Sequence, residues 1–233
     1  MPHNRVVAAD RSAPVRLVSA VLAMTGVMLL VAAVGEFLVV PSGLVRGVDL
    51  AWVERARGWI DGRPTLEDAT LLWADLSGPW VVHPLVLLLA AGLVLTGRAP
   101  RRALLVVPLG LAGWALGSLC KLLVARPRPE PDVPIAMVDS FSYPSGHATN
   151  VALGAVLVIA LLRMVGRRWI RWSATVLVLL VAALTALNRL ALGVHFVSDV
   201  VAGLVLGVTM ALVGLRLLGP VTPGREGRHS PLP

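Results

Sequence analysis

Long apolar runs separated by short polar stretches dominate the chain. The runs over 17–40, 103–124 and 172–190 reach the roughly 20 residues that a helix needs to cross a bilayer core. The first of them is longer than a secretory h-region of about 7–15 residues, which favours an uncleaved span. Further apolar runs cover about 80–96, 146–162 and 195–218. The pattern therefore predicts an all-α, polytopic membrane protein with six transmembrane helices.

Between the runs 17–40 and 80–96, residues 41–64 have a different pattern. Val53, Ala56 and Ile60 recur at helical spacing with charged residues between them, which is typical of an amphipathic helix lying on a membrane surface. Another helix should follow and break at Ser77-Gly78-Pro79. We expect a membrane domain over 17–218 with its motif-bearing core at about 70–218, and disordered cytoplasmic tails over 1–16 and 219–233.

Composition agrees with a membrane protein. The chain has 233 residues, of which 57% are hydrophobic and 15% are charged, and its mean hydropathy is +0.81. These values exclude an ordinary soluble domain. The net charge of +8 does not indicate a nucleic-acid partner, because the basic residues are scattered between apolar runs. The single cysteine excludes an intramolecular disulfide and a thiolate metal cluster.

The distribution of Lys and Arg predicts the orientation. With the N-terminus inside, thirteen of the 21 basic residues fall in inner segments and eight in outer segments. The positive-inside rule then puts both termini in the cytoplasm of a cell membrane, with six spans between them.

In this topology the polar residues of the apolar region collect on the outer face. Charges at membrane depth cost a few kcal/mol each and usually face the interior of a helix bundle. Here they come from the end of the run 103–124, the start of the run 146–162 and the junction between the runs 172–190 and 195–218. The candidate site residues are Lys121, Arg128, Ser145, Gly146, His147, Arg189, His195 and Asp199.

The cationic side chains of Lys121, Arg128 and Arg189 imply an anionic ligand. Arginine makes forked bonds to phosphate oxygens, and lysine acts as a point charge. Ser145 and Gly146 begin a predicted helix, where free N–H groups and the helix dipole favour an anion. Together these groups predict a phosphate site.

Two histidines complete the requirements of phosphoryl transfer, since one can attack phosphorus while the other protonates the leaving oxygen. His195 and Asp199 are four residues apart, so a helix would put them on one face. A carboxylate that holds one imidazole nitrogen makes a histidine an effective nucleophile or base. The competing interpretation is a metal site of His147, His195 and Asp199, but the nearby cations would repel a metal ion.

Three stretches, KLLVARPRP (121–129), PSGH (144–147) and NRLALGVHFVSD (188–199), resemble the signature motifs of the type 2 phosphatidic acid phosphatase (PAP2) superfamily. The family patterns are Lys, six residues, Arg-Pro; then Pro-Ser-Gly-His; then Ser-Arg, five residues, His, three residues, Asp. All three occur here in order and on one predicted membrane face. One position departs from the pattern, because Asn188 stands where the family usually has Ser.

The resemblance implies roles for the matching positions. His195 would be the nucleophile that forms a phosphohistidine, Asp199 would orient it, and His147 would be the general acid. Substrate binding would fall to Lys121, Arg128, Ser145, Gly146, Arg189 and Asn188. An asparagine amide can still donate a hydrogen bond to a phosphate oxygen, so we expect activity to survive the departure at Asn188.

We therefore expect a membrane phosphatase without metal or other cofactor, acting on a lipid-linked phosphomonoester or pyrophosphate at the outer face. Membrane lipid would surround it, and no nucleic acid is expected. Undecaprenyl pyrophosphate, phosphatidic acid and phosphatidylglycerol phosphate are all family substrates, and the sequence does not choose among them, nor does it specify an oligomeric state. A phosphotransferase using the same phosphohistidine is the nearest enzymatic alternative. An anion or lipid transporter, or a binding protein, could use the same cationic pocket without hydrolysis.

Overall fold

The computed structural model describes residues 13–129, 135–136, 138–164 and 167–219. Every regular element in these residues is helical, which confirms the all-α prediction. The elements in chain order are α1 (Ala13–Val34), a π-helical extension η1 (Gly35–Val39), α2 (Gly43–Arg57), α3 (Pro64–Leu76), α4 (Pro79–Leu95), a 3₁₀ turn η2 (Arg101–Leu105), α5 (Val106–Val124), α6 (Gly146–Leu162), α7 (Arg168–Ala191) and α8 (Val197–Leu218).

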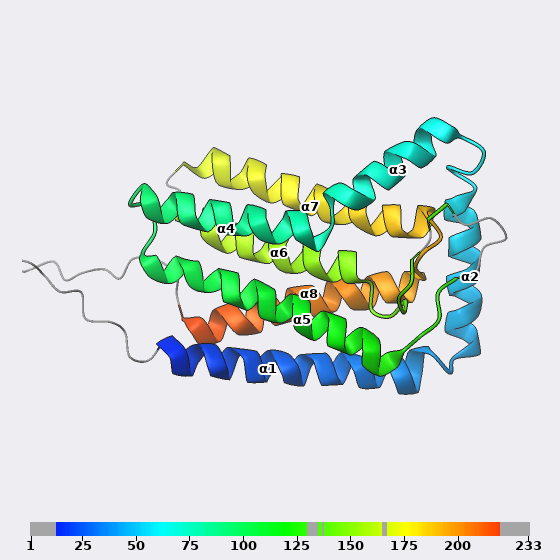
Figure 1. The fold of residues 1–233 in the computed structure, drawn as a ribbon, viewed down its shortest axis with the longest axis horizontal. Coiled ribbons are helices and arrows are strands. Elements are labelled where there is room, and N and C mark those ends of the chain that lie inside the picture. Colours follow the sequence, from blue (N-terminus) through cyan, green and yellow to red (C-terminus); the bar gives the residue numbers. More distant parts are fainter. Residues whose placement is uncertain (1–12, 130–134, 137, 165–166, 220–233) are drawn as a thin grey trace, which may run out of the picture.

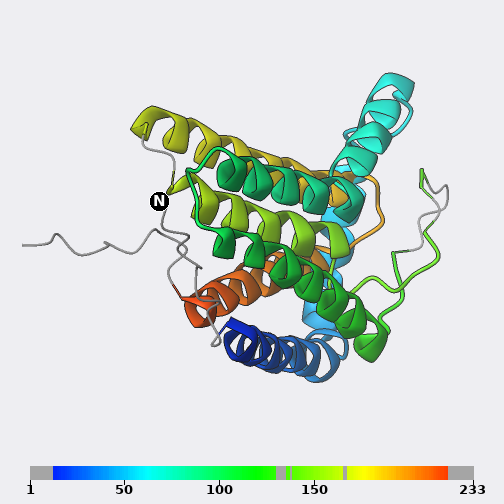
Figure 2. The same cartoon turned by 60° about the vertical axis from the view of Figure 1, so that its left-hand side comes forward.

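The long helices run side by side along the molecule, and α2 crosses one end of the bundle (Figure 1); the bundle consists of α1, α4, α5, α6, α7 and α8. Helix α6 lies in the middle and contacts α4, α5, α7 and α8. Figure 2 shows the same bundle from a second direction, with α8 below α6 and α1 below α8. Large apolar side chains such as Leu88, Leu122 and Leu177 are exposed on the outside of the bundle, where lipid would cover them.

Helices occur at all six of the predicted apolar runs. Four are long and apolar enough to cross a membrane, namely Ala13–Val39, Ala103–Val124, Arg168–Ala191 and Val197–Leu218. Helices α3 and α4 are bent by 49° at their junction and together could make a fifth span. Helix α6 is apolar but shorter, at 17 residues. The count of six spans therefore stays a prediction.

The predicted segment boundaries agree with the structure in part. Helix α1 already begins at Ala13, so the end of the expected tail 1–16 is helical, and residues 1–12 and 220–233 lie outside the described residues. The amphipathic helix expected within 41–64 is present as α2, and Val53 and Ala56 are on its buried side. Ile60 is also buried, but it lies in the turn after the end of this helix. The expected break at Ser77–Pro79 separates α3 from α4.

Glycines allow α6 and α8 to approach closely. A Cβ atom added at Gly203 would lie only 2.6 Å from the backbone oxygen of Ser145, and one added at Gly207 would lie 2.9 Å from the backbone nitrogen of Leu153. Small residues four apart commonly serve this purpose between membrane helices. The close approach brings the starts of the two helices together, and the amide of Ser145 donates to the backbone oxygen of Asp199 at 2.9 Å.

The loop after α5 carries the first motif across the end of the bundle. Ala125 adopts a left-handed conformation (φ 47°), and its amide donates to the Lys121 carbonyl. This sharp turn directs the residues that follow away from the axis of α5. Farther along the loop, the hydroxyl of buried Tyr143 donates to the Val31 carbonyl at 3.2 Å, which fixes the loop to α1. Burial raises the pKa of Tyr143 to about 12, so this hydroxyl keeps its proton at neutral pH.

Candidate active site

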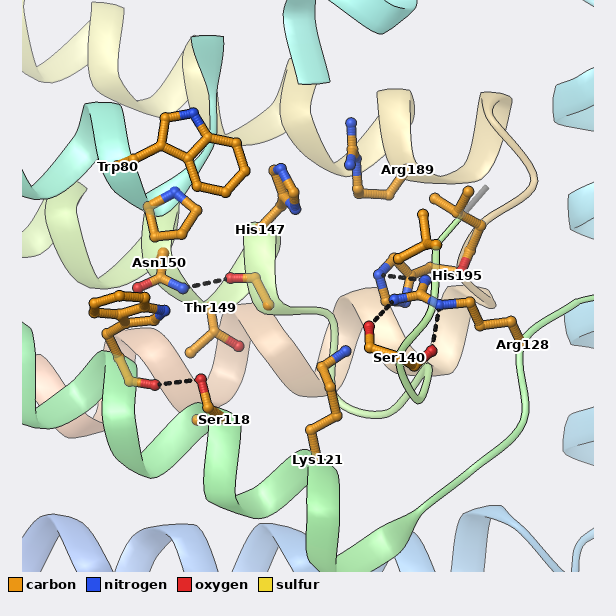
Figure 3. A pocket seen from close by; sticks show the side chains of 16 residues that line it. Trp80, Ser118, Lys121, Arg128, Ser140, His147, Thr149, Asn150, Arg189 and His195 are labelled. Carbon is orange, nitrogen blue, oxygen red and sulfur yellow. Dashed lines mark hydrogen bonds between the residues drawn. The ribbon is translucent and has the colours of Figure 1, made fainter. Parts of the chain in front are cut away.

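Six of the predicted site residues line one cavity of about 260 Å³ at the end of the bundle; one of them is Gly146, and the other five contribute side chains. They are Lys121 from α5, Arg128 from the following loop, His147 from α6, Arg189 from α7 and His195 from the α7–α8 loop. Figure 3 shows these side chains converging from different elements. The fold thus brings together residues that are far apart in the sequence.

The three cationic side chains of the cavity are held by neutral groups. Lys121 Nζ donates to the Phe141 carbonyl at 2.6 Å. Arg128 donates to the backbone oxygens of Ser140 and Val194, at 2.6 Å and 2.5 Å. Arg189 donates from Nε to Asn188 Oδ1 at 3.1 Å. Among the described residues none of the three forms an ion pair with a carboxylate, so their charges are available to an anion.

Arg128 bears most directly on His195. It lies in the loop, and burial lowers its pKa while the charge of Asp199 opposes that shift. Its Nη1 lies 3.2 Å from His195 Nε2. A guanidinium can only donate, so Nε2 must present its lone pair toward Arg128.

The other ring nitrogen of His195 faces Asp199. Nδ1 lies 3.5 Å from Asp199 Oδ2, which is longer than a normal hydrogen bond. Burial lowers the pKa of His195 to about 3, although Asp199 raises it. The ring is therefore neutral, with the proton on Nδ1 and the lone pair of Nε2 directed into the cavity.

His147 contacts the end of α3 and the start of α4. Its Nε2 lies 3.1 Å from the Ala74 carbonyl, which can only accept, so this nitrogen carries a proton. The ring of Trp80 packs edge-on against it, with the centroids 6.1 Å apart. In Figure 3, His147 faces the cavity on the side opposite Lys121.

The remaining predicted residues do not line the cavity with a free side chain. Ser145 is the N-cap residue of α6, and its buried hydroxyl has no hydrogen-bond partner among the described residues. Asn188 is occupied on both sides, since its Nδ2 donates to the Thr70 carbonyl at 2.8 Å and its Oδ1 accepts from both Nε and Nη2 of Arg189. A direct bond from Asn188 to a phosphate stays a prediction.

Several residues near the cavity were not singled out from the sequence. Trp80, Trp114, Ser140 and Asn150 line it. Asn150 Oδ1 also lies 2.7 Å from Nε2 of His83. Only Asn150 carried a usable signal, because it is a polar residue one turn after His147 inside an apolar helix.

Two more charged residues lie directly behind Asp199. Arg126 and Asp49 are both buried, and Arg126 donates to both carboxylates. Asp49 could have been recognised as an acid on the buried side of an amphipathic helix, four residues before Val53. No local pattern identifies its partner 77 residues later.

The donor set of the cavity is suited to an anion. Among the described residues no three His, Cys, Asp or Glu side chains lie close enough to share a metal ion. The groups that are close together are three cations, two imidazoles and a carboxylate behind one of them. This arrangement can bind a phosphoryl group and provide both a nucleophile and a proton donor.

Comparison with known proteins identifies the family. Residues 102–222, more than half of the chain, match the PAP2 superfamily. The decaprenylphosphoryl-5-phosphoribose phosphatase of Mycobacterium tuberculosis (strain CDC 1551 / Oshkosh) is 36% identical over 133 residues, which are 55% of this chain and 68% of that protein. The undecaprenyl-diphosphatase of Sulfolobus acidocaldarius is 32% identical over 113 residues, 46% of this chain and 51% of that protein.

A solved structure has the same fold. The crystal structure of a transmembrane PAP2-type phosphatidylglycerolphosphate phosphatase from Bacillus subtilis is similar with a TM-score of 0.69, covering 84% of this chain and 94% of that one at 24% identity. The region that matches the family, residues 102–222, includes all three motifs and the cavity residues Lys121, Arg128, His147, Arg189 and His195. The chain therefore belongs to the PAP2 superfamily and is a multi-pass membrane phosphatase of this type.

Proposed function

We propose that this phosphatase hydrolyses a lipid-linked phosphomonoester or pyrophosphate through a phosphohistidine on His195, without a metal ion. The observation that carries the proposal is the geometry of His195. One ring nitrogen faces Asp199, and the other faces a cavity shared by three cations that have no carboxylate partner in the part of the chain that the structure describes.

The cations would bind the transferred phosphoryl group. Lys121, Arg128 and Arg189 approach the cavity from different helices and the loop, so together they can surround the equatorial oxygens of the phosphate. Charged donors that are already in place stabilise the negative charge of the transition state without reorganisation. A metal ion would be repelled by the same three charges.

The first chemical step would be attack by Nε2 of His195 on phosphorus. An N–P bond forms as the P–O bond to the leaving group breaks, and the electron pair of that bond stays on the leaving oxygen. His147, as an imidazolium with protons on both ring nitrogens, donates one of these protons to this oxygen and becomes neutral. The Nδ1 proton of His195 remains on the ring, where Asp199 stabilises the resulting positive charge.

The second step would return the enzyme to its starting state. A water molecule attacks phosphorus from the side that the leaving group has vacated, and the N–P bond breaks. His147, now neutral at the nitrogen that gave its proton, takes a proton from the water. Inorganic phosphate and a free imidazole result.

A lipid-linked substrate fits the surroundings of the cavity. Trp80 of α4 and Trp114 of α5 line it and are also exposed on the outside of the bundle, at 61% and 44%. A headgroup could thus occupy the cavity while its apolar chain remains in the bilayer. Two relatives are named for decaprenyl- and undecaprenyl-linked phosphates, which supports a long-chain prenyl or comparable lipid as the carrier.

The proposed orientation has the cavity on the outer side and both termini in the cytoplasm, as the distribution of basic residues predicts. The measurement is protease access to a C-terminal tag in intact cells. Cleavage of the tag from outside would invert this topology.

Phosphate release by the detergent-purified protein in EDTA tests the function. The substrates are phosphatidic acid, phosphatidylglycerol phosphate and undecaprenyl pyrophosphate, each run beside His195→Ala. We expect release with the wild type and none with the variant. Folded wild-type protein that binds these lipids but releases no phosphate would instead favour a transporter or binding protein, and loss of activity in EDTA would contradict the metal-free mechanism.

A further inference from the structure

Arg126 lies at the centre of a buried ionic cluster behind the proposed nucleophile. Its Nη1 donates to Asp199 Oδ1 at 2.6 Å and its Nη2 to Asp49 Oδ2 at 2.8 Å. The guanidinium also lies over the ring of Phe196, with Cζ 4.2 Å from the centroid. Stacking and forked bonds hold the guanidinium in one orientation. Arg126 is one of the six residues that the first family motif leaves unspecified.

Asp49 completes the cluster from outside the six-helix bundle. It is 1% exposed and comes from α2, the helix that crosses the end of the bundle. Besides Arg126 it accepts from the amide and the hydroxyl of Ser198, at 2.9 Å and 2.5 Å. That amide belongs to the first turn of α8, whose N–H groups favour an anionic partner.

The cluster determines which oxygen of Asp199 faces the histidine. Oδ1 is taken by Arg126, while Oδ2 accepts from the Phe196 amide at 2.9 Å and lies 3.5 Å from Nδ1 of His195. A carboxylate that accepts from two sides cannot rotate about its last torsion without losing buried hydrogen bonds.

The cluster also determines how much negative charge is left for His195. One guanidinium serves two carboxylates, so Arg126 cannot neutralise Asp199 fully. If Asp49 lost its charge, Arg126 would interact with Asp199 alone. The negative potential that Asp199 exerts on His195 would then be weaker. If Arg126 were lost, two acids would be buried with no cation between them.

We propose that Asp49 and Arg126 are positioning residues. They fix the orientation of the Asp199 carboxylate and set how much of its negative charge acts on His195, so that α2 contributes to catalysis. This inference rests on the proposed function, because it assigns its effect to the Asp199–His195 pair. Neither residue lines the phosphate cavity. Their loss should therefore slow turnover while leaving phosphate binding by Lys121, Arg128 and Arg189 intact.

The test is steady-state turnover of the lipid that the wild type hydrolyses fastest, together with inhibition by inorganic phosphate. Asp49→Asn keeps the shape of the side chain and should lower kcat on the order of 10-fold to 100-fold, the range for a group one step behind a functional histidine. KM and the phosphate inhibition constant should stay within about two-fold of the wild type. Glu54→Gln is the matched control, since it removes an exposed carboxylate from the same helix, and it should change nothing.

A double-mutant cycle adds a second readout. Arg126→Gln should lower kcat at least as much as Asp49→Asn, and the double variant should be no slower than Arg126→Gln alone, because both act through one carboxylate. Asp49→Glu retains the charge and should recover part of the lost turnover.

Three results would overturn the inference. One is an Asp49→Asn variant as active as Glu54→Gln, and another is a parallel loss of kcat and phosphate inhibition. The third is a failure of both Asp49 variants to fold, which would make Asp49 a folding determinant only. The proposed function fails separately, if His195→Ala retains turnover or the wild type has none.

Discussion

Arg128 Nη1 lies 3.2 Å from Nε2 of His195, so the nitrogen proposed to attack phosphorus already faces a phosphate-binding cation. A bound phosphoryl group would lie against both atoms, with an oxygen on Arg128 and its phosphorus facing Nε2 of His195. Arg128 can then exchange the imidazole lone pair for a phosphate oxygen, while its bonds to Ser140 hold the side chain in place. Binding and attack are thereby directed to the same point.

Arg128→Ala should weaken inhibition by inorganic phosphate roughly 10-fold to 100-fold, because a hydrogen bond to a charged group contributes about 1.5–3 kcal/mol. Arg128→Lys should recover only part of this, since lysine lacks the forked geometry. The phosphate inhibition constant is the measurement. Arg55→Gln, an exposed arginine on α2, serves as the control, and equal inhibition of Arg128→Ala and the control would remove Arg128 from the phosphate site.

Asn188→Ala should weaken phosphate inhibition by about 10-fold, because Arg189 would lose the oxygen that accepts from its Nε and Nη2. Asn188→Ser, which restores the usual family residue, should be less affected. If Asn188→Ala leaves the inhibition constant unchanged, the orientation of Arg189 does not depend on its neighbour.

Stability should depend on pH through His195. Burial lowers its pKa in the folded protein to about 3, whereas the ordinary value is about 6.5. Between these values the unfolded chain binds a proton that the folded chain does not. The free energy of unfolding should therefore fall as pH falls below about 6.5, by up to about 1.4 kcal/mol per unit.

His195→Gln removes this titration, so its unfolding temperature in detergent should drop less than that of the wild type between about pH 7.5 and pH 5. An equal drop in both proteins would mean that His195 is not held neutral by burial.

Gly203→Ala should damage both packing and activity. The added methyl group would lie 2.6 Å from the backbone oxygen of Ser145, and overpacking of this kind costs about 1–3 kcal/mol. Since Ser145 is the N-cap residue of α6, the separation of α6 from α8 would also displace His147 from His195. Thermal unfolding and kcat are the two measurements. Gly92→Ala, at a helical position with open space around it, is the control, and equal behaviour of both variants would contradict the packing argument.

Much of this architecture could be predicted from the sequence, because its causes are local or periodic. Apolar runs of sufficient length predict helices, and their alternating direction brings the ends that carry Lys121, His147 and His195 to one side. The helical spacing of Val53 and Ala56 predicted α2 in the same way.

The rest depends on contacts between distant residues. Asp49 and Arg126 are an ion pair across 77 positions, and no pattern around either residue identifies the other. The hydrogen bond from Asn188 to the Thr70 carbonyl depends on α3 packing against α7. With its amide nitrogen occupied there, Asn188 directs its Oδ1 to Arg189. The bend between α3 and α4, which gives His147 its Ala74 partner, likewise depends on how two helices pack.

The most direct test of the mechanism is a search for the covalent intermediate. The enzyme is mixed with a lipid phosphate carrying a labelled phosphoryl group, quenched within the first turnover in alkali, where phosphohistidine survives, and digested for mass spectrometry. We predict the label on the peptide that contains His195, and none on that peptide in His195→Gln. Label on another residue, or full turnover in His195→Gln, would contradict the assignment of His195 as the nucleophile.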